Sequence, residues 1–171
     1  MPGPHTLSET ERKIAEKIGK LPIDYQAMSV TSNLFRASIA LRNQLERSVL
    51  AKHELSWTAF VVLWVAWIWE PVETRTIAEE GGFSKATLTG VMRTLESRGL
   101  LKRKPSQIDR RLVMVTLSPK GRKLMNTLFP EFNKGEQQAV SEIDRANLEL
   151  FAGMLRTVTE TAASGKLFTE N

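Results

Sequence analysis

The sequence predicts an α+β fold that is mainly α-helical and carries one small β-hairpin. An apolar stretch of 13 residues, Trp57–Trp69, lies between Ser56 and Pro71 and predicts a buried helix. Ser84 and Gly99 bracket an amphipathic segment, and an apolar β-prone run follows the polar turn "PSQIDRR". At 171 residues, with 42% hydrophobic and 25% charged residues, the chain has the composition of one globular domain.

The first 22 residues are predicted to form an N-terminal arm. They contain a candidate helix from Ser8 to Lys20, in which Ser8 and Glu11 have the spacing of a capping box. No signal peptide is expected, and Trp57–Trp69 is shorter than the about 20 residues that cross a bilayer. The chain has no cysteine, which is typical of a reducing compartment, so we expect a cytoplasmic protein with a single domain over residues 23–171.

Helical periodicity and capping residues define the next elements. Apolar positions recur from Asp24 to about Lys52 and predict a long helix. Ser56 caps a second helix that Pro71 ends, and Thr74 to Glu80 forms a short third helix. After the turn at Gly81 and Gly82, Ser84 caps a fourth helix that runs to Arg98.

A hairpin and two further helices complete the prediction. Strands are expected over Leu100–Lys104 and Leu112–Leu117, and Ser118 with Pro119 starts a fifth helix that ends near Pro130 or continues there with a kink. The last helix has an apolar stripe that repeats at intervals of three and four residues, which favours packing on a partner chain or, alternatively, on the chain's own core. The stripe comprises Leu148, Phe151, Leu155, Val158 and Ala162.

Positive charge is concentrated in one part of the chain. Eleven basic and two acidic residues from Lys85 to Lys123 give a local charge of +9, whereas the whole chain carries +5. Such a surface attracts polyanions, of which nucleic acid is the commonest in a cell; a solvated face is the alternative.

The order of short helix, Gly-Gly turn, capped helix and basic hairpin predicts a winged helix-turn-helix. Its fourth helix would enter the major groove of DNA, because its first turns carry free N–H groups and polar side chains. The candidate DNA contacts on this helix are Ser84, Lys85, Thr87, Thr89 and Arg93. Gly90 lowers its helix propensity by about 1 kcal/mol, which close approach to DNA or neutral drift would explain.

The hairpin tip carries Asp109, Arg110 and Arg111, and its first strand adds Arg103 and Lys104 as candidate DNA contacts. An arginine suits the narrow minor groove, so we assign Arg111 to the groove and give Asp109 the role of fixing the Arg111 side chain. The alternative is a turn-forming aspartate beside solvated arginines.

These residues resemble the MarR family of bacterial transcriptional regulators. The resemblance is carried by "FSKATLTGVMRTLESRGLL", by "DRR" at the tip and by "VTLSPKGRKL", and in element order it covers roughly residues 29–163. It implies a homodimeric winged helix-turn-helix protein, usually a repressor, that binds a pseudo-palindromic operator and is released by a small aromatic or phenolic ligand. The DNA-binding lobe would span about 56–117, and the dimerisation region about 23–55 and 118–165. The long arm and the lack of cysteine depart from the family, and the latter excludes thiol-based sensing.

The resemblance also implies a ligand pocket between the dimerisation helices and the DNA-binding lobe. In this chain the border of that pocket holds Arg42, His53, Trp57, Phe60 and Trp64. The rings would form an apolar wall, and Arg42 or His53 would bind a carboxylate. Alternatively the rings fill the core, and His53 is a surface or capping residue.

Other functional classes find little support in the sequence. Two distant histidines, no cysteine and no Gly-rich phosphate loop leave no metal site, no cofactor site and no catalytic motif. We therefore expect no enzyme. The closer alternative is a DNA-binding protein that is controlled by a protein partner or that has no effector.

Overall fold

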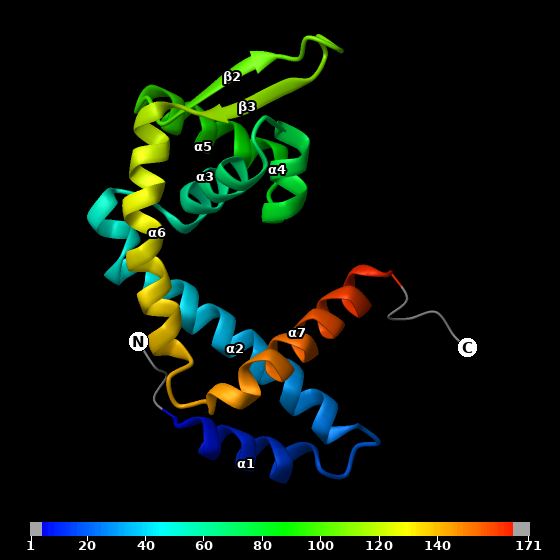
Figure 1. The fold of residues 1–171 in the computed structure, drawn as a ribbon. Coiled ribbons are helices and arrows are strands. Elements are labelled where there is room, and N and C mark those ends of the chain that lie inside the picture. Colours follow the sequence, from blue (N-terminus) through cyan, green and yellow to red (C-terminus); the bar gives the residue numbers. More distant parts are fainter. Residues whose placement is uncertain (1–4, 166–171) are drawn as a thin grey trace.

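The computed structural model describes residues 5–165. Residues 1–4 of the expected arm and residues 166–171 of the expected domain lie outside this range. Helices form both ends of the molecule, and one long helix joins them (Figure 1). One end carries α3, α4, α5 and the hairpin, whereas α1, α2 and α7 lie at the other end.

The arm contains a helix, but its cap differs from the prediction. Helix α1 spans Leu7–Ile18, and its capping box pairs Thr6 with Glu9 rather than Ser8 with Glu11. The backbone N–H of Thr6 donates to the Glu9 carboxylate at 2.8 Å, and this bond lowers the pKa of Glu9. Glu11 is thereby left for a tertiary contact: its Oε1 accepts from Nδ2 of Asn33 at 2.8 Å and joins α1 to α2.

The predicted long helix is divided in two. Helix α2 spans Tyr25–Ser48, with the side chain of Asp24 as its N-cap, and the 3-10 helix η1 follows over Leu50–His53. Glu54 ends η1 in the left-handed region, at a φ of 54°. The change of direction buries Val49 and Leu50 in the core. Helical periodicity could not predict this break, because it depends on packing against other segments of the chain.

The helices of the expected DNA-binding lobe follow the predicted caps. Helix α3 spans Trp57–Trp69 after the N-cap Ser56, α4 spans Thr74–Gly81, and α5 spans Lys85–Ser97 after the N-cap Ser84. Gly99 has a φ of +69°, as its predicted place after the helix end requires.

The hairpin belongs to a three-stranded antiparallel sheet. Strand β2 (Leu101–Pro105) pairs with β3 (Val113–Leu117), and the two-residue strand β1 (Val72–Glu73) pairs with the other edge of β3. The sequence did not predict β1, because two residues are too short for a periodic signal. Val72 lies opposite Val115 and ties the end of α3 to the hairpin.

Helix α6 (Pro119–Ala139) connects the two ends of the molecule and continues through Pro130. Its side chains Met125, Leu128 and Phe132 are buried in the core. Helix α7 (Leu148–Ala163) follows the 3-10 helix η2 (Arg145–Asn147) and contributes no buried residue. Across residues 5–165, no helix is long and apolar enough to span a membrane.

Candidate nucleic-acid interface

Helix α5 has one face in the core and the opposite face free. Leu88, Met92 and Leu95 are at most 4% exposed, whereas Lys85 and Arg93 are exposed. Neither cation has an ion pair within the described part of the chain. The apolar face of the helix is therefore packed against the core, while Lys85 and Arg93 face solvent.

The three hydroxyl groups that were predicted as DNA contacts already make bonds within the helix. Ser84 Oγ accepts from the Thr87 N–H at 3.1 Å and lies 2.8 Å from Thr87 Oγ1, and Thr89 Oγ1 donates to the Lys85 carbonyl at 2.7 Å. These side chains thus stabilise the helix start, and Lys85 and Arg93 are the long cationic side chains left to reach a ligand.

Sequence reasoning singled out Gly90 but missed the other small residues at the centre of the exposed face. Ala86, Gly90 and Ser97 all lie there, opposite the buried Leu88 and Met92. A Cβ built on Gly90 would have no atom within 4 Å, so packing within the chain does not require glycine at this position. These small residues form a strip without long side chains, which we call the flat strip, and Lys85 and Arg93 lie along one side of it. Ala86 and Gly90 also line a hollow between α5 and residues 54–59. The helical spacing of Ala86 and Gly90 was the available signal.

The tip of the hairpin is ordered by its own hydrogen bonds. The N–H of Ser106 donates to the Leu112 carbonyl at 2.8 Å, and the N–H of Leu112 donates to the Asp109 carbonyl at 2.9 Å. Asp109 Oδ1 accepts from the backbone N–H of Arg111 at 2.9 Å. Asp109 therefore shapes the turn, as the alternative reading of the sequence expected, and makes no ion pair with Arg111 among the described contacts. Arg110 and Arg111 are exposed.

Arg103 connects the hairpin to α5. Its Nη2 and Nε donate to Glu96 Oε2 at 2.5 and 3.0 Å. The hydrogen bond from Arg103 lowers the pKa of the Glu96 carboxyl, against the opposing effect of burial. Arg103 is thus partly neutralised, whereas its neighbour Lys104 is exposed.

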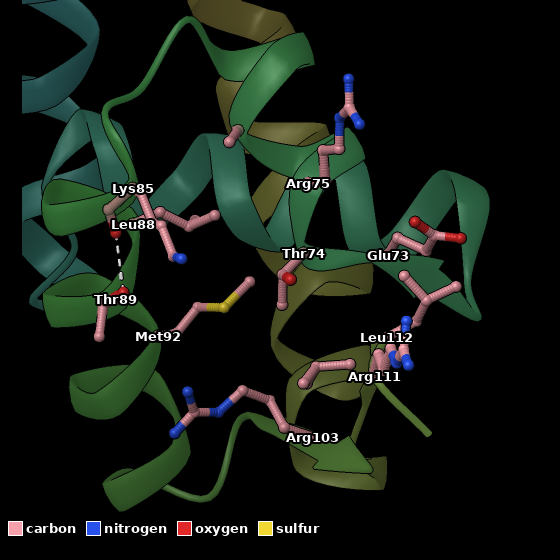
Figure 2. Close-up of a pocket in the computed structure, with 12 residues that line it drawn as sticks. Glu73, Thr74, Arg75, Lys85, Leu88, Thr89, Met92, Arg103, Arg111 and Leu112 are labelled. Atoms are coloured by element: carbon pink, nitrogen blue, oxygen red, sulfur yellow. Dashed lines mark hydrogen bonds between the residues drawn. The ribbon is translucent and has the colours of Figure 1, made fainter. Parts of the chain in front are cut away.

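A hollow of about 530 Å³ separates α5 from the hairpin and the start of α4 (Figure 2). Four cationic side chains line it: Arg75, Lys85, Arg103 and Arg111. Its wall also includes Leu88, Met92 and Leu112. Of the predicted cations, Lys85, Arg103 and Arg111 therefore share one hollow, whereas Arg93, Lys104 and Arg110 do not line it, and Arg75 was not predicted.

Of the predicted ligand-binding rings, Phe60 is buried in the core, and Trp57 and Trp64 are partly buried against it. Phe60 stacks on Phe132 with centroids 4.3 Å apart, and Trp64 stacks on Phe129 at 4.5 Å. Trp57 lies 6.1 Å from Phe60, so the structure brings the three predicted rings together.

The two polar residues of that set lie differently. Arg42 is exposed on α2, and His53 Nε2 lies 3.8 Å from Glu131 Oε2. None of the five predicted residues lines the hollow beside the hairpin or the second hollow, of about 470 Å³, between residues 54–59 and α5. The described residues also contain no group of three His, Cys, Asp or Glu side chains suited to a metal ion.

The chain itself covers only part of the apolar stripe of α7. Phe151 is 44% exposed and Ala162 is exposed, while Leu148, Leu155 and Val158 are partly exposed. None of the five residues is fully buried, and none belongs to the hydrophobic core cluster of the described residues. Helix α2 has uncovered apolar side chains too, including Phe35, which is 72% exposed.

Comparisons with known proteins agree with this architecture. Residues 55–113 match the model of the MarR family. A Bacillus subtilis protein described as an uncharacterized HTH-type transcriptional regulator, YwaE, is 35% identical over 157 residues, which cover 90% of this chain and 92% of that protein.

Two solved structures show the same fold. Bordetella bronchiseptica BpsR, whose DNA binding is regulated by 6-hydroxynicotinic acid, has a TM-score of 0.69 and 25% identity, over 76% of this chain and 98% of that one. S. aureus MepR, solved as a DNA complex, has a TM-score of 0.68 and 21% identity, over 76% and 96% of the two chains.

The fold and the exposed basic helix and hairpin define a DNA-binding transcriptional regulator of the winged helix-turn-helix class, not an enzyme. More particularly, the chain belongs to the MarR family. We therefore call α5 the recognition helix and the hairpin of β2 and β3 the wing.

Proposed function

We propose that the chain is a homodimeric repressor that binds a pseudo-palindromic operator and is released by a small aromatic or phenolic ligand. The observation that carries this proposal is the separation of two surfaces. The cationic recognition helix and wing lie at one end, and the uncovered apolar faces of α2 and α7 lie at the other (Figure 1). A second copy can cover the apolar faces while both cationic ends stay free for DNA.

The DNA-binding lobe, about residues 56–117, would place the recognition helix in the major groove and the wing in the adjacent minor groove. Lys85 and Arg93 lie along one side of the flat strip that would face the base edges, and Arg111 would enter the minor groove from the ordered tip. The DNA backbone between the two grooves would then pass over the hollow whose rim carries Lys85, Arg103 and Arg111. The other predicted DNA contacts, Ser84, Thr87, Thr89, Lys104, Asp109 and Arg110, would hold or extend these elements.

The dimerisation region would comprise about residues 23–55 and 118–165. Phe35 of α2 and Leu150, Phe151 and Met154 of α7 are between 44% and 72% exposed, an uncovered apolar surface that favours association. A dimer also binds DNA more tightly and more selectively than one module, because two recognition helices about 34 Å apart contact consecutive turns of the same duplex.

For the effector, the relative BpsR supports an aromatic acid. Arg42, His53, Trp57, Phe60 and Trp64 remain our candidate residues at the border of the two regions. Since Phe60 and Trp64 are stacked on Phe132 and Phe129, a ligand would have to bind at the edge of this cluster or displace a ring. Either event would alter the position of α6 relative to α3 and, through it, the spacing of the recognition helices.

The dimer is tested by mass in solution. Analytical ultracentrifugation should give twice the 19.3 kDa mass of the chain. Phe151→Asp should yield monomers that bind DNA weakly, because a charge replaces an apolar contact, whereas Glu160→Gln on an exposed site of α7 should leave the dimer intact. A wild-type protein that stays monomeric while it binds its operator tightly would refute the proposal.

Effector control is tested separately. A panel of hydroxylated aromatic acids, followed by tryptophan fluorescence and by operator release, should identify a ligand that produces both signals. Release by no member of the panel would instead support control by a protein partner.

A further inference from the structure

Arg98 lies at the end of the recognition helix and makes the longest-range side-chain bonds of that helix. It is the C-cap residue of α5. Its Nη1 donates to the Glu54 carbonyl at 2.6 Å, and its Nη2 donates to the His53 carbonyl at 2.9 Å. One guanidinium therefore joins two acceptors that lie 44 and 45 residues earlier in the chain.

The two acceptors terminate the unit formed by α2 and η1. His53 is the last residue of η1, and Glu54 caps it in the left-handed conformation. Carbonyls at a helix end lack partners within the helix and carry partial negative charge, so a cation is favoured there. The Arg98 side chain is 29% exposed, which protects these charge-assisted bonds from much of the solvent.

The same end of the recognition helix is also fixed to α6. Lys120 Nζ donates to the Arg98 carbonyl at 2.9 Å, and Ser118 Oγ donates to the Gly99 carbonyl at 2.6 Å. Among the described hydrogen bonds, however, those from α5 and its C-cap to η1 all come from the Arg98 side chain. Arg98 is thus the direct polar link between the recognition helix and the end of α2.

We propose that Arg98 is a positioning residue that sets the direction of the recognition helix relative to α2, and thereby the half-site spacing that the dimer accepts. This inference rests on the proposed homodimer, in which α2 belongs to the interface. A planar guanidinium with several fixed donors holds two carbonyls in a defined orientation. Without it, each recognition helix can tilt about its attachment to α6, and the dimer tolerates operators of altered spacing.

The test measures spacing selectivity. An operator is first selected with the wild-type protein from random duplexes. Affinities are then compared for this operator and for versions with one base pair added or removed between the half-sites, which rotates them by about 35°. The wild-type protein should lose about 10-fold or more in affinity. Arg98→Met should weaken operator binding, but its loss on altered spacing should fall below about 3-fold.

Arg122→Met is the matched control. Arg122 lies in the same half of the molecule and pairs with Glu70, so its replacement removes one positive charge and one ion pair without touching η1. This variant should keep the wild-type spacing selectivity. The two variants should have similar salt dependence of binding, because the inference concerns helix direction and not phosphate contacts.

Arg98→Gln is the second variant, since its single amide can hold only one carbonyl; it should give intermediate selectivity, with folding checked by thermal melting. Wild-type spacing selectivity in a folded Arg98→Met or Arg98→Gln protein would overturn the inference and leave the proposed function intact. A loss of selectivity in Arg122→Met equal to that in Arg98→Met would also overturn it. If the wild-type protein selects no paired half-sites, the proposed function itself fails, and the inference fails with it.

Discussion

Replacing Gly90 by alanine should stabilise the fold and weaken DNA binding. Gly90 lies in the middle of the recognition helix, is exposed, and has no positive φ. Because a Cβ there meets no atom within 4 Å, alanine fits without a clash. Alanine is favoured over glycine in a helix by about 1 kcal/mol. For a chain of this size, that gain raises the melting temperature by about 2 to 4 °C.

The added methyl group projects from the flat strip that would face the base edges. A recognition helix in contact with the groove floor has no room for another carbon atom, so the helix must shift and lengthen its hydrogen bonds to the bases. Loss of one such contact is worth about 1 to 3 kcal/mol, which corresponds to a loss of about 5- to 150-fold in operator affinity.

Thermal melting and fluorescence anisotropy with a labelled operator measure the two effects on the same protein. Asn126→Ala, at an exposed site of α6, is the control and should raise the melting temperature without changing affinity. A Gly90→Ala protein that is stabilised and binds the operator as tightly as the wild type would refute close approach along this strip. A lower melting temperature would refute the argument from helix propensity.

Three further predictions concern the tip of the wing, the ion pair of Arg103 with Glu96, and a second glycine. Arg111→Ala should reduce operator affinity, and it should lower by about 1 the slope of log affinity against log salt concentration. Gln107→Ala, at an exposed site of the same tip, should change neither quantity. Equal slopes for the two variants would show that Arg111 does not contact the DNA. Since the pKa of Glu96 is lowered in the folded chain, its pairing with Arg103 stabilises the fold above the ordinary carboxyl value of 4.5, and this contribution is lost as the pH falls through the lower folded value. The wild type should therefore melt at a higher temperature than Glu96→Gln, by an amount that is constant above pH 4.5 and shrinks as the pH falls below it. The stabilisation should be less than about 1 kcal/mol, because both side chains are about one-third exposed. A difference in melting temperature that grows in acid would contradict this direction. Gly121→Ala should destabilise the fold by about 1 to 3 kcal/mol, because its Cβ would clash with the Leu100 carbonyl oxygen, and a denaturation midpoint equal to that of the wild type would show that this contact relaxes freely.

The sequence alone determined the elements whose causes are local. Ser56, Ser84 and Ser118 each accept a hydrogen bond from an N–H three residues later, so these three helix starts could be read from the sequence. The same rule failed at Ser8, because Thr6, two residues earlier, caps that helix. The wing was predictable in the same way, because the polar turn and the β-prone runs beside it are adjacent in the chain.

The tertiary structure decided the features that depend on segments far apart in sequence. Nothing near Gly90 or Gly121 in the sequence tells which of the two could accept a side chain; only the packing of Leu100 against α6 decides it. The bonds of Arg98 to His53 and Glu54 and the stacking of Phe60 on Phe132 are of the same kind. Local hydrogen bonds form within a few residues and leave a pattern in the sequence, whereas contacts across the fold depend on how whole elements pack, which no single segment encodes.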